Sequence, residues 1–274
     1  MRFHEREFIF MIFLFASLCV RNQAELSASD IFKKISPSIF TVSVGNSRGS
    51  GVVIGKKSII TNCHVVTKGL NIKVSHKESN YNADLLYADI DTDLCQLHVP
   101  DLDAPIVDLG KLETVVVGSP AFTIGSPRGL DLTISEGIIS SKREHEGNTV
   151  IQTTAAISKG SSGGGLFDAK GRLIGVTTFY VAKGQSLNFA MPSDLILKLP
   201  QTSLIEDKLS SKYFLKSHYY EAKKAFTVAE KNALNWVRDY PESWFAWLKL
   251  GGYQRQLNKH TESLVSFKEV IRIN

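Results

Sequence analysis

Residues 160–166 read Gly-Ser-Ser-Gly-Gly-Gly-Leu, and the serine at position 162 is the most informative residue of the chain. Its Gly-x-Ser-x-Gly setting is a weak signal by itself, because unrelated folds carry it. The candidate partners of Ser162 decide between those folds. His64 closes one apolar run, and Asp93 opens another run 29 residues later, so both stand before the serine.

The order of these residues along the chain separates two kinds of hydrolase. In the nucleophile elbow of an α/β-hydrolase, the acid and then the histidine follow the serine. After Ser162 only His218 and His260 remain, and both lie in a stretch of helical periodicity. The order His, Asp, Ser is that of chymotrypsin-type enzymes, so the sequence predicts this arrangement and excludes the elbow.

The N-terminus has the features of a secretory signal. Arg2 and Arg6 precede thirteen apolar or small residues, Phe8 to Val20, a stretch too short to span a bilayer. We therefore expect residues 1–24 to be a signal peptide cleaved after Ala24, and the protein to be secreted without a stable membrane span. The alternative is a retained membrane anchor.

Charge divides the remaining chain into two parts. Residues 25–200 hold 17 Lys and Arg against 17 Asp and Glu, and residues 201–274 hold 12 against 8 without a basic run. So mild an imbalance argues against nucleic acid as a partner. No metal-ligating or cofactor-binding constellation is seen, so we predict neither a metal site nor a cofactor.

Two cysteines, Cys63 and Cys95, remain after processing of the N-terminus. In an oxidising compartment they can form a disulfide across the first lobe. The interpretation we favour from the sequence is that both are free thiols that replace small buried residues.

Residues 25–200 are predicted to be all-β. Short β-branched segments are separated by Gly or Lys turns, which is typical of strands. Their even spacing, without helices between them, predicts antiparallel barrels rather than a parallel sheet. The expected strands are 39–44, 51–54, 58–61, 71–75, 84–87, 94–99, 114–117, 132–140, 149–153, 172–180 and 187–191, with helices at 28–35 and 193–199 on either side of them.

After a linker at 201–209, residues 210–274 have helical periodicity. Two registers 34 residues apart match the tetratricopeptide repeat (TPR), so we predict two TPR-like helix pairs; the alternative is an unrelated helical hairpin with an aromatic core. Two repeats leave more aromatic surface than they can bury, so we expect packing on the barrel part, on a second copy or on a protein partner. The matching positions are Tyr213, Tyr220, Phe226, Ala229, Ala233, Trp236 and Pro241, then Trp247, Leu250, Gly251, Leu257, Ser263, Phe267 and Val270.

The three polar residues can form a catalytic triad. A serine hydroxyl is a poor nucleophile until a base takes its proton, and His64 can do this for Ser162. A carboxylate must then hold the imidazole ring. We choose Asp93, because it stands at the entry of an apolar strand, and keep Asp91 as the alternative. Asp89 lies with Asp91 in a polar turn.

The glycines around the serine can form an oxyanion hole. A tetrahedral intermediate needs preorganised backbone N–H donors. We expect the amides of Gly160 and Ser162 to supply them, in a tight turn that a bulky residue at position 160 would hinder.

Several motifs together resemble the HtrA/Deg-type trypsin-like serine proteases of bacterial envelopes. The resemblance covers roughly residues 28–197 and implies two barrels, with His64 and Asp93 on the first, Ser162 on the second and the site in the cleft between them. It also implies a periplasmic location and protein or peptide substrates. The motifs are Gly49–Ile54, Thr61–Val65, Thr92–Leu94, Ile151–Leu166 and Asn188–Ser193.

The resemblance also suggests which residues bind substrate. Ala156, Ile157, Leu187 and Phe189 would line the primary pocket. Because no acidic residue lies at its expected base, cleavage after small aliphatic residues is predicted and cleavage after Lys or Arg is not.

Two features depart from related families. Ser161 replaces the aspartate that precedes the nucleophile in digestive trypsins, so activation by N-terminal cleavage is not expected. TPR-like helices stand where HtrA proteins usually carry a PDZ domain. The sequence thus predicts a serine endopeptidase of envelope protein quality control or processing. The alternative is a protease-like scaffold that acts through its TPR helices.

Overall fold

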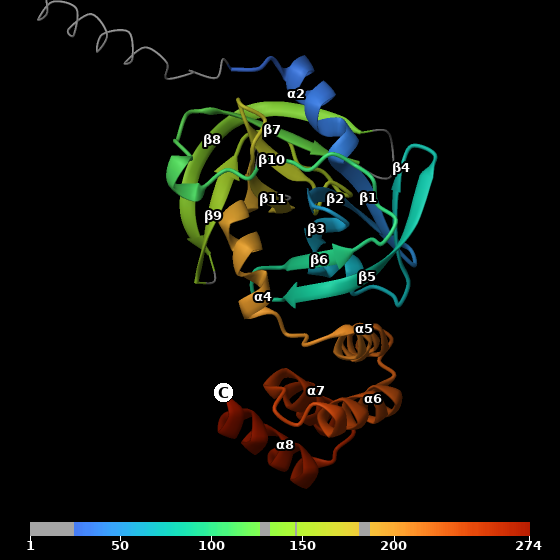
Figure 1. Cartoon of the computed structure of the whole chain (residues 1–274). Coiled ribbons are helices and arrows are strands. Elements are labelled where there is room, and N and C mark those ends of the chain that lie inside the picture. Colours follow the sequence, from blue (N-terminus) through green and yellow to red (C-terminus); the bar gives the residue numbers. More distant parts are fainter. Residues whose placement is uncertain (1–24, 127–131, 146, 181–186) are drawn as a thin grey trace, which may run out of the picture.

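The computed structural model describes residues 25–126, 132–145, 147–180 and 187–274, which form two closed six-stranded antiparallel barrels and a set of C-terminal helices (Figure 1). The predicted double barrel followed by helices is confirmed. The expected signal peptide, residues 1–24, lies outside the described residues. Among the described helices, none is long and apolar enough to cross a membrane.

The first barrel closes in the order β1-β2-β3-β6-β5-β4. Its strands alternate buried and exposed side chains where one face meets solvent, for example along β4. A short helix, α3 (Cys63–Val66), follows β3 and contains His64. The strands are β1 (Ile39–Val44), β2 (Ser47–Gly55), β3 (Ser58–Asn62), β4 (Ile72–His76), β5 (Ser79–Asp89) and β6 (Leu94–His98).

Cys63 and Cys95 form a disulfide inside this barrel, so the interpretation as free thiols is wrong. Strands β3 and β6 are neighbours, and Thr61 pairs with Cys95 in their register. This brings the Cα atoms of the two cysteines to 4.9 Å, within the range that a disulfide requires. The sequence could not show the pairing, because strand register depends on the whole barrel.

The second barrel closes in the order β10-β11-β12-β9-β8-β7. Helix α2 (Ala28–Ile35) precedes both barrels and buries Ile31 and Ile35 in a core that also includes residues of β7 and β11. The strands are β7 (Pro120–Gly125), β8 (Thr133–His145), β9 (Asn148–Thr153), β10 (Gly165–Asp168), β11 (Leu173–Tyr180) and β12 (Asn188–Pro192).

The predicted strand at 114–117 is wrong. A 3-10 helix, η2 (Leu112–Thr114), lies there, and the chain then turns before β7 begins at Pro120. Val115 is buried, but Val116 and Val117 are 61% and 57% exposed. Their β-branched side chains favour extended backbone, yet no neighbouring strand pairs with this run among the described residues. Strands β7 and β10 were not predicted, although each pairs with the strand that follows it in the sequence, β8 and β11.

The C-terminal part contains four helices, α5 (Lys208–Ala222), α6 (Phe226–Asp239), α7 (Trp244–Gln256) and α8 (His260–Ile273). They follow η4 (Ser193–Lys198) and α4 (Leu199–Thr202), where a single helix was expected. The Asp207 side chain caps α5 by accepting hydrogen bonds from the amides of Leu209 and Ser210. A Cβ atom at Gly251 would lie 2.8 Å from the Phe267 ring, so this glycine allows α7 and α8 to pack closely.

The helices dock on the first barrel. Phe214 and Trp236 are fully buried and share one apolar core with barrel residues such as Leu97. Figure 1 shows α5 next to β5. The Leu204 amide donates to the Ala88 carbonyl at 2.7 Å, which ties the connecting segment to β5. The expected packing of the aromatic helices on the barrel part is therefore observed.

Candidate active site

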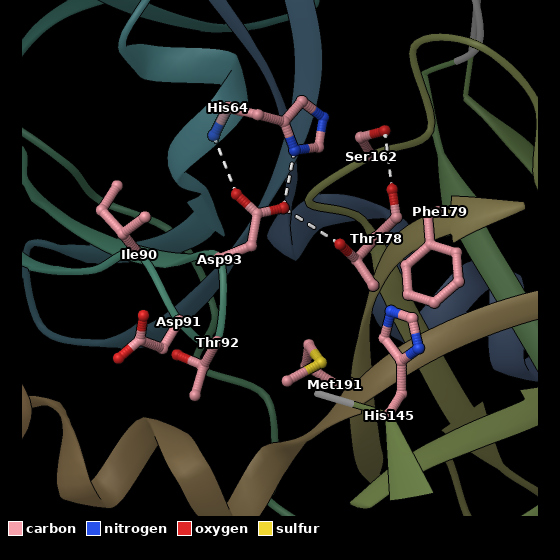
Figure 2. A pocket seen from close by; sticks show the side chains of 10 residues that line it. All are labelled: His64, Ile90, Asp91, Thr92, Asp93, His145, Ser162, Thr178, Phe179 and Met191. Carbon is pink, nitrogen blue, oxygen red and sulfur yellow. Dashed lines mark hydrogen bonds and ion pairs between the residues drawn. The ribbon is translucent and has the colours of Figure 1, made fainter. Parts of the chain in front are cut away.

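Asp93 holds His64 by two contacts. Its Oδ2 lies 2.6 Å from His64 Nδ1, and its Oδ1 accepts a hydrogen bond from the His64 amide at 2.9 Å (Figure 2). Asp93 precedes β6 with a φ of +54°, a left-handed conformation that aspartate tolerates better than most residues. The ring is thereby fixed in position and in orientation.

Thr178 of β11 supplies a third contact to this carboxylate. Its hydroxyl donates to Asp93 Oδ2 at 3.0 Å, although Thr178 belongs to the second barrel. The sequence did not identify this residue, because a threonine inside a strand carries no distinguishing pattern. The two barrels are thus joined at the acidic residue of the site.

The other two aspartates do not contact His64. Asp89 is buried, and its carboxylate accepts hydrogen bonds from the amides of Asp91 and Thr92 within the turn. The Asp91 side chain is exposed to solvent. Of the three candidates, Asp93 is therefore the residue that lies against the imidazole.

Ser162 lies beside this pair, across the cleft. Its hydroxyl donates to the Thr178 carbonyl at 3.3 Å and not to His64. That distance exceeds the usual 2.7–2.8 Å of an O–H···O bond, so the contact is weak. Figure 2 shows the second ring nitrogen of His64 on the side of Ser162.

The loop around the serine is held by Ser50 of the first barrel. The Ser50 amide donates to the Ser162 carbonyl at 2.7 Å, and its hydroxyl donates to the Gly160 carbonyl at 2.9 Å. Ser50 is fully buried. Glycine is required at two positions of the loop: φ is +99° at Gly160 and +82° at Gly163, where a Cβ would also lie 2.2 Å from the Ser50 carbonyl.

The backbone amides of Gly160 and Ser162 are free to bind an anion. Neither donates a hydrogen bond to any part of the chain that the structure describes. Two unpaired N–H groups beside a serine hydroxyl are the chemistry that an oxyanion hole needs.

A cavity of about 390 Å³ opens beside the serine (Figure 2). It lies between the two barrels, and the His145 and Phe179 rings form its wall on the second barrel, with centroids 5.0 Å apart. The described residues that line it are His64, Ile90, Asp91, Thr92, Asp93, His145, Ser162, Thr178, Phe179 and Met191. The structure thus brings the three predicted triad residues to one cavity.

The four residues expected to bind substrate do not line this cavity. Ala156 is exposed, and Ile157 is 7% exposed. Leu187 is half-buried, and the Phe189 ring stacks on Phe179 at 4.7 Å. Phe189 thus contacts the cavity wall through Phe179, and the part of all four residues in a primary pocket stays a prediction.

Comparison with known proteins agrees with this geometry. Residues 49–176 match the family described as trypsin-like peptidase domain. Over 173 residues the chain is 35% identical to a protein of Pseudomonas putida named "Probable periplasmic serine endoprotease DegP-like", which covers 60% of this chain. The chain spans 36% of the length of that relative.

Solved structures show the same fold. The serine endoprotease of Yersinia pestis superposes with a TM-score of 0.59 and 28% identity, over 65% of this chain and 67% of that one. An HtrA-type protease, AlgW with a tripeptide, superposes with a TM-score of 0.61 and 30% identity, over 65% of this chain and 63% of that one. These findings support a trypsin-like serine protease domain of the HtrA/DegP type.

Proposed function

We propose that this chain is a serine endopeptidase in which Ser162 is the nucleophile, His64 the general base and Asp93 the residue that orients the base. The observation that carries the proposal is that the Asp93 carboxylate contacts both the backbone amide and the ring Nδ1 of His64. The glycine-flanked Ser162 lies in the same cavity. The similarity to proteins named serine endoproteases supports it.

The reaction follows from these positions. His64 Nε2 takes the proton of the Ser162 hydroxyl as its oxygen attacks the peptide carbonyl, and Asp93 stabilises the imidazolium that forms. The imidazolium then gives the proton to the leaving amine, so the C–N bond breaks and an acyl ester remains on the serine. Water, activated by the same imidazole, hydrolyses the ester and regenerates the hydroxyl.

The oxyanion hole is assigned to the amides of Gly160 and Ser162. Ser50 holds both carbonyls of this turn, at Gly160 and Ser162, and so fixes the orientation of the loop. A preorganised donor acts on the charge that develops in the transition state without reorganisation at the moment of reaction.

The preferred residue before the scissile bond is proposed to be small and aliphatic. Ala156, Ile157, Leu187 and Phe189 are apolar residues of the second barrel that a pocket beyond the described cavity would use. A lysine ammonium buried among them without a counter-charge would be costly.

The cellular role is proposed to be protein quality control or processing in the bacterial periplasm. A relative named periplasmic supports the location, and so does the apolar N-terminal stretch of the sequence. The Cys63–Cys95 disulfide agrees with an oxidising compartment. Helices α5–α8 are proposed to be two TPR-like pairs that bind protein. A scaffold without catalysis is the weaker hypothesis, because the triad residues and both free amides are retained.

Digestion of an unfolded protein such as casein tests this function. We expect wild-type protein to cut it after Val or Ala, as mapped by mass spectrometry, and the Ser162→Ala variant to leave it whole. Equal cleavage by both proteins would refute the assignment. A majority of cuts after Lys or Arg would refute the proposed pocket alone.

A further inference from the structure

A second cavity continues from the catalytic one. It measures about 570 Å³, and Asp91 and Thr92 line both cavities. Its other walls come from Lys198 at the end of η4 and from Trp244 at the start of α7. It therefore forms a groove, which we call the interdomain groove, between the barrels and the helical part. Figure 1 shows η4 and α4 running from the second barrel toward those helices.

The walls of the interdomain groove are held in place. The Ala88 amide donates to the Ser203 hydroxyl at 3.2 Å, and the next residue, Leu204, is bonded to the Ala88 carbonyl. The Trp244 ring packs edge-on against Phe245, with centroids 5.6 Å apart. Phe245 is itself buried in the core that the helices share with the first barrel. A ligand would thus meet a preformed surface rather than a mobile one.

Two polar groups at this groove lack a hydrogen-bond partner within the described residues. Thr92 is 7% exposed, and its hydroxyl makes no hydrogen bond. The Trp244 indole N–H donates to no described atom, whereas that of Trp247 donates to the Pro241 carbonyl at 2.8 Å. The Thr92 hydroxyl oxygen is enclosed within the wall, whereas Trp244 is half-buried and its indole N–H is not among the buried unpaired atoms of the described residues. A bound peptide backbone carries the carbonyl acceptors that this indole N–H can use.

The charges at the groove also lack ion-pair partners. No described cation lies within ion-pair distance of the Asp91 carboxylate at the junction of the two cavities, nor any described anion within that distance of Lys198. Both side chains are exposed. A cationic side chain of a ligand would therefore find an unpaired carboxylate where the catalytic cavity opens into the groove.

The two halves of a substrate would contact different residues of the site. The leaving half of the substrate must reach His64, which protonates its amine. The acyl half stays on Ser162, whose hydroxyl lies against Thr178 at the cavity wall. From there the cavity extends past Thr178 and Met191 to Asp91 and Thr92 (Figure 2). The acyl half is the N-terminal half of the substrate.

We propose that the interdomain groove binds the stretch of unfolded polypeptide that lies N-terminal to the scissile bond, with Trp244 as the anchor and Asp91 selecting a basic side chain. The inference rests on the proposed protease function. It gives the helical part a role in substrate binding.

Quenched fluorescent peptides with one shared core test the groove. One is the core alone, with Val before the scissile bond. The others carry about six further residues on the N-terminal or the C-terminal side, which span roughly 20 Å when extended. We expect the N-terminal extension to raise kcat/KM about tenfold, mainly through KM, and the C-terminal extension to change it less than about twofold. A lysine in the N-terminal extension should add about two- to fivefold, which Asp91→Asn removes.

The control is a second tryptophan of α7 that lies outside the groove. In Trp244→Ala the ratio of kcat/KM between the N-terminally extended peptide and the core peptide should fall from about tenfold to about twofold or less. In Trp247→Ala this ratio should stay at about tenfold. Circular dichroism establishes that both variants are folded. An equal gain from either extension, or loss of the ratio in Trp247→Ala alone, would overturn the proposal.

Binding separates this inference from the proposed function. The Ser162→Ala protein is titrated with the fluorescein-labelled peptides, and anisotropy gives Kd. If the wild-type protein cleaves no peptide, the proposed protease function is wrong. The titrations then test by themselves whether the groove binds the N-terminal extension. An N-terminally extended peptide that binds about tenfold more tightly than the core, and loses this gain in Trp244→Ala, supports the groove. Equal Kd values refute it.

Discussion

The two barrels hold their parts of the site in different ways. The first barrel is crosslinked by Cys63–Cys95 and covered by the helices, and it presents His64 and Asp93 already joined. The second barrel contains no cysteine, and the hydroxyl of Ser162 makes only a weak hydrogen bond, to the Thr178 carbonyl. Its catalytic loop is instead held by Ser50 of the first barrel. The proposed base is thus held within its own barrel, and the loop of the proposed nucleophile is held by contacts between the barrels.

The largest loss of activity should follow from removing the side chain of either Ser162 or His64. We expect Ser162→Ala and His64→Ala each to lower turnover by about 10⁶-fold, and the double variant to lose little more, because the residues act as one unit. Rates of casein or peptide cleavage measure this. Losses that multiply in the double variant would mean that the two barrels act independently.

The preset base can be tested through Asp93. Asp93→Asn keeps the shape of the side chain but takes away the carboxylate that holds His64, so kcat should fall by about 10⁴-fold. The matched control is Asp91→Asn, since Asp91 does not contact the imidazole. With the short core peptide its loss should be far smaller. Equal losses in both variants would contradict the assignment of the acid.

The crosslink should stabilise the protein substantially. The disulfide closes a loop between residues 32 positions apart, which corresponds to about 3–4 kcal/mol in the chain-entropy account. Reductant should therefore lower the free energy of unfolding of the wild-type protein by this amount in urea titrations. The Cys63→Ala/Cys95→Ala variant should be insensitive to reductant. An unchanged wild-type midpoint would show that the crosslink adds nothing to the first barrel.

The stability of the helical part should decrease in acid, because His218 of α5 packs against Phe214 and Phe245. Burial, with the Lys249 ammonium nearby, lowers the pKa of His218 to about 4, below its ordinary value of 6.5. The unfolded chain therefore takes up a proton first as pH falls. The stability due to neutral His218 is complete above pH 6.5 and is lost between 6.5 and 4. Between pH 7 and 4.5 the loss is about 2–3 kcal/mol.

A variant at this position isolates the effect from other titrating groups. His218→Leu should lose about 2–3 kcal/mol less than wild type over the same change in pH, as measured by urea unfolding. The control is His260→Leu at the exposed start of α8, which should follow wild type. Parallel curves for all three proteins would show that His218 does not titrate on unfolding.

The sequence was enough to propose the site residues, and the structure brings them to one cavity, but the sequence missed some of the strands around them. Chain order identified His64 and Ser162, and the strand entry distinguished Asp93 from Asp91. Those signals are local. The disulfide depends on the pairing of β3 with β6, and the contacts of Ser50 and Thr178 depend on how the two barrels meet. A β-branched run such as 114–117 reports only local conformational preference, so it predicted a strand where pairing partners are lacking among the described residues.

Labelling by a fluorophosphonate tests the central claim most directly, because the reagent reacts only with a serine activated by a base. Mass spectrometry of the labelled wild-type protein should place the adduct on Ser162. The adduct should be absent from Ser162→Ala and strongly reduced in His64→Ala. Equal labelling of wild-type and His64→Ala proteins, or an adduct on another serine, would contradict a nucleophile on the second barrel activated by a base on the first.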